Sequence, residues 1–223
     1  MTNNELTNSM LPNIIGITGR KFNGKDTLGN YFVEKYGYKR IAFADSLKNA
    51  CKEIFGFTNE QLHGDKKEDI DEYWKVSPRT ILQYVGTELF RNQLKIIMPE
   101  ISNDIWLKVV EKKILDEFKI NPNAKIVITD VRFENECQMV KNLGGIVVRV
   151  KRNSLCNSTN STNSTNSTNS TNSTNSTNST NSTDVHQSEL EIDKLNVTVE
   201  ISNDTTKEDL FMNIYNFLSA NII

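Results

Sequence analysis

The most constraining feature of the chain is an apolar run, Ile14–Thr18, that leads directly into a loop bracketed by Gly19 and Gly24. A buried strand, a glycine loop and a helix start, in this order, form a cradle for a phosphate group, because the N–H groups of the loop and of the first helical turn point at the same anion. Lys25 adds a positive charge near the β- and γ-phosphates. The alternative is a Gly-Lys turn before an ordinary helix.

The loop fits the pattern G-x-x-x-x-G-K, and the residue after the lysine departs from it. That position usually holds Ser or Thr for Mg²⁺, but here it holds Asp26, and Thr27 follows. We therefore expect the Thr27 hydroxyl to contact the metal. The residues expected to hold the nucleotide in this segment are Gly19, Asn23, Gly24, Lys25, Asp26 and Thr27.

Length and composition limit the remaining classes of protein. At 223 residues, the chain fits a single domain, 1–223, with room for an insertion. The formal net charge is −2, so no overall field draws it to nucleic acid or to a membrane. The three cysteines, odd in number and without metal-binding spacing, indicate unpaired thiols in a reducing compartment. Because Met1–Pro12 lacks the layout of a signal peptide, we expect a cytoplasmic protein.

A low-complexity tract interrupts the C-terminal part of the chain. Over residues 157–183 the triplet Asn-Ser-Thr repeats nine times, without an apolar or charged residue. Such a composition cannot bury a hydrophobic face, so we predict a disordered insertion in a surface loop. Expansion of a tolerated loop is one explanation of the tract, and a role in binding a partner or in adjusting a lid is another.

Elsewhere, short apolar runs alternate with helical patterns. Runs rich in β-branched residues are typical of buried parallel strands. We predict an α/β fold with a parallel five-stranded sheet, helices on both faces, and the last strand near an edge. The predicted strands are Ile14–Thr18, Ile41–Phe43, Lys125–Thr129, Ile146–Val150 and a fifth around Val197–Ile201; Thr205 and Glu208 form a capping box before the final helix.

Residues 46–120 show no clear strand, which predicts a helical insertion suited to a substrate lobe. Within it, a helix begins at Ser77 and Pro78. Polar side chains four residues apart share one face of an α-helix, and these are Arg79, Gln83, Thr87 and Arg91. The opposite face is expected to be buried and holds Ile81, Leu82, Val85 and Leu89. Such a polar face can grip a phosphate and contact a base edge; a solvated helix face is the alternative.

An acid follows the predicted strand Lys125–Thr129. Asp130, at the carboxyl end of a parallel strand beside the phosphate loop, can hold Mg²⁺ or its water. Arg132 points the same way if the strand continues, and can then meet a transferring phosphoryl group. The alternative is that both residues cap the next helix. The predicted metal ligands are thus Thr27 and Asp130.

Other polar residues lie next to the expected cleft. Asp45 and Lys48 follow the second strand and face the cleft, unless Asp45 is a helix cap. Trp106 either stacks on a base or fills the core. Arg152 precedes the tract and Glu189 follows it; a loop with cations at its root, opposite a phosphate cradle, is typical of a closing lid.

In order and spacing, these motifs resemble the deoxynucleoside monophosphate kinases of bacteriophages and large DNA viruses, which are P-loop kinases. The resemblance covers nearly the whole chain outside the tract and Met1–Pro12, and the Gly-Lys-Asp-Thr form of the loop is typical of that family. The segments that carry it are Gly19–Thr27, Phe43–Lys48, Arg79–Glu88, Ile105–Leu107, Asp130–Arg132 and Asp184–Glu189. It implies transfer of the γ-phosphoryl group of ATP, with Mg²⁺, to a deoxynucleoside monophosphate, with a tendency toward dGMP and dTMP.

The resemblance also implies roles for single residues. Asn203 and Asp204 would lie near the adenine of ATP, and Arg152 would contact ATP from the lid. The residues implied in catalysis are Lys25, Arg79, Asp130 and Arg132. By resemblance, Arg79, Gln83 and Trp106 would contact the acceptor nucleotide around its base. All residues predicted to bind the acceptor nucleotide are Asp45, Lys48, Arg79, Gln83, Thr87, Arg91, Trp106, Arg132 and Glu189.

Two other functions remain open from the sequence. One is another small-molecule P-loop kinase, of the phosphomevalonate or dephospho-coenzyme A type, and the arginine-bearing helix followed by Trp106 favours a nucleotide acceptor over it. The other is a non-catalytic ATP-binding scaffold, against which Lys25, Thr27 and Asp130 together argue. We expect small nucleotides as partners, without nucleic acid or a membrane, in the host cytoplasm if the chain is viral; a homodimer is left open.

Overall fold

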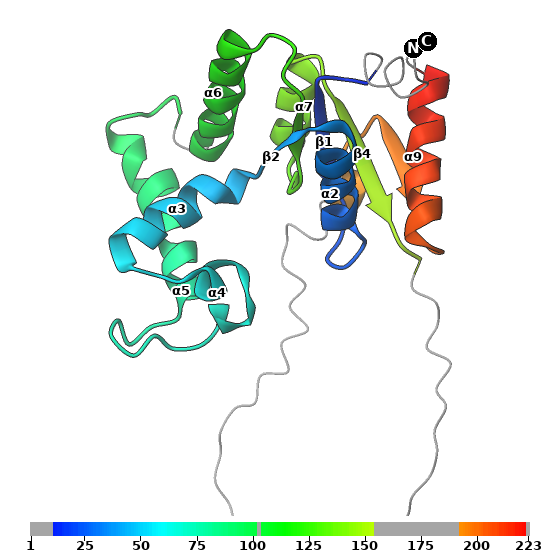
Figure 1. Ribbon diagram of the computed structural model, residues 1–223. Coiled ribbons are helices and arrows are strands. Elements are labelled where there is room, and N and C mark those ends of the chain that lie inside the picture. The colour runs from blue at the N-terminus through cyan, green and yellow to red at the C-terminus, as the bar shows by residue number, and fades with distance from the viewer. Residues whose placement is uncertain (1–10, 102–103, 154–191, 222–223) are drawn as a thin grey trace, which may run out of the picture.

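A five-stranded, fully parallel sheet in the order β2-β3-β1-β4-β5 forms the centre of the protein (Figure 1). The computed structural model describes residues 11–101, 104–153 and 192–221. The strands are β1 (Ile14–Thr18), β2 (Lys39–Ile41), β3 (Ile126–Ile128), β4 (Ile146–Lys151) and β5 (Val199–Ser202). The predicted sheet is therefore confirmed, with β5 at an edge. Because β1 is central and the chain leaves it in both directions, ligands are expected at its carboxyl end.

Helices cover both faces of the sheet, because successive strand residues point into two different cores. Ile15 and Ile17 of β1 belong to the core under α2 and α9, whereas Ile14 belongs to the core under α6 and α7. The helices are α2 (Lys25–Tyr36), α6 (Ile105–Ile120), α7 (Glu134–Asn142) and α9 (Lys207–Asn221). All five residues of β1 are buried, as its continuous apolar sequence requires. None of the described helices is long and apolar enough to cross a membrane.

Between β2 and β3, the chain has helices and turns but no strand in residues 42–101 and 104–125. The elements before α6 are α3 (Phe43–Phe55), α4 (Asn59–His63), α5 (Pro78–Gln83), the 3₁₀ helices η1 (Asp65–Lys67) and η3 (Leu94–Ile96), and η2 (Tyr84–Gln93). They share a small core of their own that includes Cys51, Phe57 and Leu62. α3, α4 and α5 extend beyond the β2 edge of the sheet as an arm (Figure 1).

A change of helix type interrupts the polar face expected between Arg79 and Arg91. α5 ends at Gln83, and η2 is a π-helix, in which the hydrogen bonds run from i to i+5. A four-residue spacing keeps side chains on one face only in an α-helix, so the expectation of one continuous face does not hold past Gln83. For the same reason the expectation that Leu89 is buried is wrong, since it is 44% exposed.

Two predicted boundaries also move. The second strand ends at Ile41 rather than Phe43, because Phe43 already begins α3. The capping box of α9 lies one residue later than predicted: Thr206 Oγ1 accepts from the Asp209 N–H at 3.1 Å, and the Asp209 carboxylate accepts from the Thr206 N–H at 3.3 Å. Thr and Asp serve as well as the predicted Thr and Glu, because both pairs satisfy two helix-end N–H groups.

Gly29 allows α2 to lie directly against the end of β3. A Cβ added there would come within 2.5 Å of Thr129 Cγ2, and Thr129 is itself only 3% exposed. We expect Gly29→Ala to lower the free energy of unfolding by about 1–2 kcal/mol, because overpacking exceeds the roughly 1 kcal/mol gain in helix propensity. Chemical denaturation beside Asn30→Ala, an exposed position on the same helix, measures this. Equal stability of the two variants would contradict the close approach.

Candidate active site

The loop between β1 and α2 has the backbone that a phosphate cradle requires. Gly19 and Gly24 have φ angles of 147° and 100°, and Phe22 between them has 66°. A Cβ added at Gly19 would lie 2.4 Å from the Val150 carbonyl oxygen, and one added at Gly24 would lie 2.4 Å from the Asn203 side-chain nitrogen. Both positions therefore need glycine for its conformation and for space.

Lys25 begins α2 and folds back over this loop. Its Nζ donates to the carbonyl oxygens of Gly19 at 2.7 Å and of Arg20 at 2.8 Å. Gly24, the N-cap of α2, is left-handed, and no side chain caps this end of the helix. A helix N-terminus and an ammonium group at one loop both favour a bound anion.

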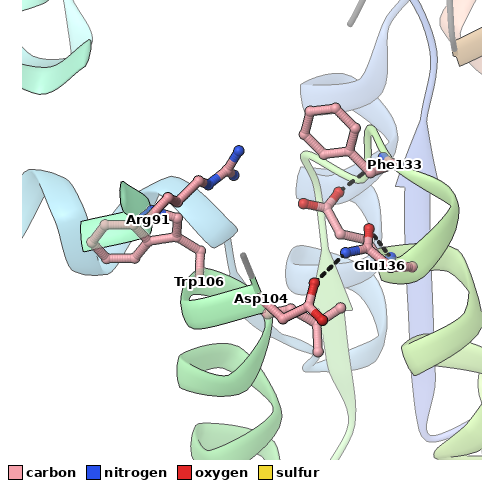
Figure 2. Close-up of a pocket in the computed structure, with 7 residues that line it drawn as sticks. Arg91, Asp104, Trp106, Phe133 and Glu136 are labelled. Atoms are coloured by element: carbon pink, nitrogen blue, oxygen red, sulfur yellow. Dashed lines mark hydrogen bonds between the residues drawn. The ribbon is translucent and has the colours of Figure 1, made fainter. Parts of the chain in front are cut away.

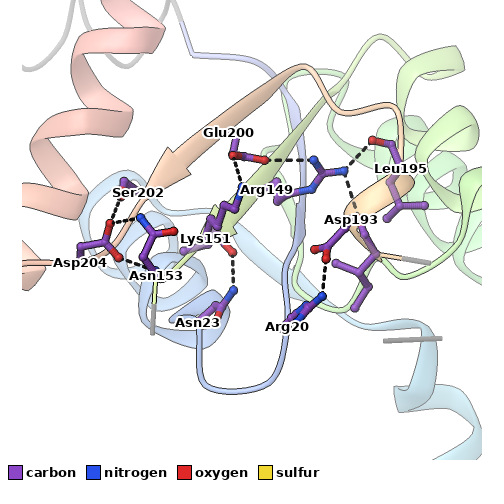
Figure 3. Close-up of polar contacts among 12 residues, drawn as sticks. Arg20, Asn23, Arg149, Lys151, Asn153, Asp193, Leu195, Glu200, Ser202 and Asp204 are labelled. Carbon is purple, nitrogen blue, oxygen red and sulfur yellow. Dashed lines mark hydrogen bonds and ion pairs between the residues drawn. The ribbon is translucent and has the colours of Figure 1, made fainter. Parts of the chain in front are cut away.

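The ends of β4 and β5 hold the loop in place (Figure 3). Asn23 Nδ2 donates to the Val150 carbonyl oxygen at 3.1 Å. Asn203 Nδ2 donates to the Asn23 carbonyl oxygen at 2.8 Å. Asn203 is 5% exposed, and Arg152 Nε donates to its carbonyl oxygen at 2.8 Å. The structure thus places Asn203 as a buried support of the loop, with Arg152 attached to it.

The described residues on either side of residues 154–191 are attached near the same loop. Asp204 accepts from the backbone N–H of Asn153 at 2.6 Å and from its side chain at 2.9 Å. Hydrogen bonds from Ser202 and then from Asn153 lower the pKa of Asp204. On the far side, Asp193 forms an ion pair with Arg20 of the loop (Figure 3). The predicted lid loop therefore leaves and rejoins the described structure beside the phosphate loop.

The two residues after Lys25 have different surroundings. Asp26 forms an ion pair with Arg40 of β2 at 2.7 Å, and Arg40 also donates to Thr129 Oγ1 at 3.1 Å. Thr27 is half-buried, and its hydroxyl has no hydrogen-bond partner among the described residues. Of these two positions, Thr27 is thus the one whose side chain is available to a metal ion.

Asp130 links β3 to the insertion. Its carboxylate accepts from the backbone N–H groups of Phe43 at 2.8 Å and Ala44 at 3.2 Å, at the N-terminus of α3. Burial raises the pKa of Asp130, and these hydrogen bonds oppose the rise. Asp45 accepts from the Ala42 N–H at 2.9 Å, so the helix-cap alternative describes its contact. β3 ends at Ile128, so the condition under which Arg132 would point the same way as Asp130, a strand that continues past Asp130, is not met.

The acidic side chains near the loop suit a Mg²⁺ ion that is bound mainly through the phosphate oxygens of a nucleotide. In the described part of the chain, no three His, Cys, Asp or Glu side chains gather as a ready-made metal site. Mg²⁺ in nucleotide enzymes uses one or two protein ligands together with phosphate oxygens. A carboxylate has about four lone-pair sites, so Asp130 can cap α3 and still hold Mg²⁺ or its water.

Basic side chains from separate segments converge near these acids. Burial lowers the pKa of Lys67 in η1, and the positive charges of Lys48, Arg79 and Arg132 act in the same direction. Burial also lowers the pKa of Lys48, against the influence of Asp45, Asp130 and Asp26. Like charges brought together in this way are stabilised by an anion between them. Within the described residues, the acidic partner of Arg79 is Glu68, at 3.1 Å.

A pocket of about 170 Å³ lies between the insertion and α7 (Figure 2). Its lining residues are Arg91, Asp104, Trp106, Leu107, Phe133, Asn135 and Glu136. Trp106 Nε1 donates to the Gly86 carbonyl oxygen at 3.0 Å, which fixes the indole ring at the pocket wall. Gln83 and Thr87, expected beside Arg91, are exposed and are not among the lining residues.

Known proteins match this chain across its insertion and beyond. Residues 49–182 match the family model described as deoxynucleotide monophosphate kinase. A protein of Acanthamoeba polyphaga mimivirus whose name assigns it to that group is 40% identical over 147 residues, which is 65% of this chain and 76% of the mimivirus protein. The chain belongs to the deoxynucleotide monophosphate kinase family.

Further relatives of the kinase are more partial or more distant. The deoxynucleoside-5'-monophosphate kinase of Escherichia phage T5 is 42% identical over 82 residues, which is 37% of this chain and 28% of the phage protein. Among solved structures, TT1252 from Thermus thermophilus gives a TM-score of 0.44 at 16% identity, over 95% of this chain and 98% of that one. A dephospho-CoA kinase from Campylobacter jejuni gives 0.42 at 13% identity, over 93% and 96%. Because both TM-scores are below 0.5, the fold is assigned from the strand order of this chain and not from these two structures.

The candidate site of the kinase brings together some of the residues predicted from the sequence with others that were not predicted. Lys25, Asp130 and the basic groups lie toward the carboxyl ends of β1 and β3, and Arg91 and Trp106 meet in the pocket. Glu189 and the Asn-Ser-Thr tract lie outside the described residues. The missed residues are Lys67, Asp104, Phe133, Asn135 and Glu136. Lys67 stands in a charged run that resembles a solvated surface, and the last three follow Arg132 in an acidic helix start.

Glu136 is the most unusual acid of the kinase. It is 6% exposed, and its Oε2 accepts from the backbone N–H groups of Arg132 at 2.7 Å and Phe133 at 3.2 Å. Burial raises the pKa of Glu136 to about 7, against its usual 4.5, and the nearby charge of Asp130 adds to the rise. Near pH 7 the protonated and the ionised forms of Glu136 are therefore both populated, and above pH 7 the carboxylate predominates.

Glu136→Gln should stabilise the nucleotide-free kinase at alkaline pH. Because the pKa is raised to about 7 on folding, the favourable contribution of Glu136 is present below its unfolded pKa and is lost as the pH rises through 7. Glutamine cannot ionise, so the variant should exceed the wild type by about 1–3 kcal/mol at pH 8 and match it near pH 4. Denaturation curves at both pH values test this. A stability difference that does not change with pH would contradict it.

Proposed function

We propose that this kinase transfers the γ-phosphoryl group of Mg·ATP to the phosphate of deoxynucleoside monophosphates, with dGMP and dTMP as preferred acceptors. The observation that carries the proposal is a glycine-bracketed loop with Lys25 at the carboxyl end of the central strand β1, together with a group of basic side chains that influence one another. Lys48 of that group lies close enough to Asp26, next to Lys25, to be influenced by its charge. Two anion-binding regions side by side suit a donor and an acceptor phosphate.

On the donor side, the phosphates of ATP would lie in the loop between Gly19 and Gly24. Lys25 would turn its Nζ from the loop carbonyl groups to the β- and γ-phosphates. Arg152, Asn203 and Asp204 would lie toward the adenine. Thr27 and Asp130 would hold Mg²⁺ or its water, and the ion, when bound, neutralises charge on the β- and γ-phosphate oxygens.

On the acceptor side, the insertion 46–120 would serve as the substrate lobe. Lys48, Lys67, Arg79 and Arg132 would surround the acceptor phosphate, whose negative charge relieves their mutual repulsion. An oxygen of this phosphate attacks the γ-phosphorus of ATP, the bond to the β–γ bridging oxygen breaks, and ADP leaves. The chemistry requires positioning and charge neutralisation more than covalent help from the protein.

The deciding experiment is an ADP-release assay with Mg·ATP against dAMP, dCMP, dGMP, dTMP and their ribose counterparts. We expect turnover selective for dGMP and dTMP. Turnover with phosphomevalonate or dephospho-coenzyme A instead would establish the alternative kinase class. ATP binding without turnover on any acceptor would support the scaffold alternative.

We further propose that the kinase acts on small nucleotides in the cytoplasm, of the host if the chain is viral, without binding nucleic acid or membranes. The formal net charge of −2 supports this, because it provides no attraction to polyanions. Light scattering coupled to gel filtration would determine whether the kinase is a homodimer.

A further inference from the structure

The pocket of Figure 2 places hydrogen-bond donors and an acceptor on opposite walls. Arg91 extends into it from η2, and Glu136 extends into it from α7. Arg91 Nε is buried and has no hydrogen-bond partner among the residues that the structure describes, and Arg91 Cζ lies 5.9 Å from the centre of the Phe133 ring. A buried donor without a partner is costly, so a ligand that accepts from Arg91 would remove this cost.

One carboxylate oxygen of Glu136 is available to accept a hydrogen bond from a ligand. Its Oε2 takes the backbone N–H groups of Arg132 and Phe133, while its Oε1 takes no hydrogen bond from the described part of the chain. In Figure 2 this second oxygen points toward the side of the pocket that carries Arg91 and Trp106. The donors and the acceptor therefore face each other across an open space.

The shape of the pocket suits a flat ring. Trp106 and Phe133 stand on opposite sides, and the indole N–H is already bound to Gly86, so the ring of Trp106 is what a ligand meets. The volume of about 170 Å³ is below the roughly 300–1,000 Å³ typical of drug-sized ligands. A single base fits this description better than a whole nucleotide.

We propose that Arg91 and Glu136 select the acceptor base by recognising a ring carbonyl group next to a ring N–H, the edge that guanine and thymine share. A carbonyl oxygen has two lone pairs and can accept from both Nε and a terminal nitrogen of Arg91, whereas a ring nitrogen has only one. The neighbouring N–H then donates to Glu136 Oε1. Adenine and cytosine would place an amino group against Arg91 and a lone pair against the carboxylate.

The proposal rests on the proposed function and predicts which substitutions abolish base choice. Wild-type kcat/KM for dGMP and dTMP should exceed that for dAMP and dCMP by about 100-fold or more. Arg91→Lys keeps the positive charge but loses the paired N–H donors of the guanidinium group. This variant and Glu136→Gln should each reduce kcat/KM for dGMP and dTMP by about 10–100-fold. The values for dAMP and dCMP should change by less than about threefold. Gln93→Ala, an exposed position in the same π-helix, should match the wild type.

A binding measurement keeps the test independent of turnover. The chain has two tryptophans, so in a Trp74→Phe background the fluorescence reports Trp106 alone. dGMP should quench the Trp106 fluorescence at a lower concentration than dAMP does. In the Arg91→Lys and Glu136→Gln variants, the two quenching concentrations should be closer to each other. Thermal unfolding confirms that each variant is folded. Equal losses for all four nucleotides, or no discrimination by the wild type, would overturn the proposal. Absence of turnover with selective quenching intact would count against the proposed function alone.

Discussion

Lys25→Ala should reduce turnover with every acceptor by about 10²–10³-fold while the protein remains folded. In the structure, Lys25 Nζ is already aimed into the phosphate loop, where it binds the carbonyl groups of Gly19 and Arg20. Alanine removes the positive charge that would face the β- and γ-phosphates, and positioning plus charge is the main contribution of such a site. The measurement is kcat for ADP release, with ATP affinity from calorimetry.

Lys35→Ala is the matched control for this result. Lys35 lies in the last turn of the same helix, and its Nζ lies 3.2 Å from the Tyr31 hydroxyl, away from the loop. We expect it to keep wild-type turnover. A folded Lys25→Ala protein with undiminished activity would refute the phosphate-loop interpretation, and with it the kinase mechanism proposed for this chain.

Asp130→Asn should weaken the response to Mg²⁺ and reduce kcat by about 10²-fold. The side chain keeps its shape and one carbonyl oxygen, so part of the cap on Phe43 and Ala44 survives. What is lost is the negative charge that would hold Mg²⁺ or its water. The measurement is the Mg²⁺ concentration for half-maximal rate at saturating ATP, which should rise several-fold.

Asp45→Asn separates the metal role of Asp130 from its capping role. Asp45 accepts from the Ala42 N–H at the same end of α3, so this variant also disturbs the cap but should leave the Mg²⁺ requirement as it is. If both variants shift the Mg²⁺ dependence equally, or neither does, Asp130 acts only through α3. Thermal unfolding of both variants measures how much of each loss is a loss of stability.

The central sheet and the phosphate loop could be predicted because their requirements are local. Ile14–Thr18 is apolar throughout because both faces of β1 are buried, and that pattern is visible in five consecutive residues. Gly19 and Gly24 stand where the backbone needs positive φ, which few other residues adopt. Such signals need no knowledge of distant contacts.

The acceptor side could be predicted only in part, because its geometry depends on contacts between distant segments. A helical pattern in the sequence assumes 3.6 residues per turn, and the π-helix Tyr84–Gln93 breaks that assumption, which moves Arg91 toward Phe133 and leaves Leu89 exposed. The proposed acceptor site includes Lys67, whose pKa is lowered by burial and then by the charges of Lys48 and Arg79, and these neighbours come from other segments of the chain. In the sequence, Glu136 has the pattern of an ordinary acidic residue at a helix start, and its burial depends on contacts that the sequence does not show.

Asn203 has a consequence for how genetic variation in this protein would be interpreted. Its side chain supports Asn23 from a position 180 residues further along the chain, and its amide nitrogen fills the space beside Gly24. A method that predicts the effect of substitutions from the N-terminal motif alone would assign a small effect to a substitution of Asn203, because Asn203 is far from that motif in the sequence. In a growth-based screen, the same change should group with substitutions of the glycines, because all of them would damage one and the same loop.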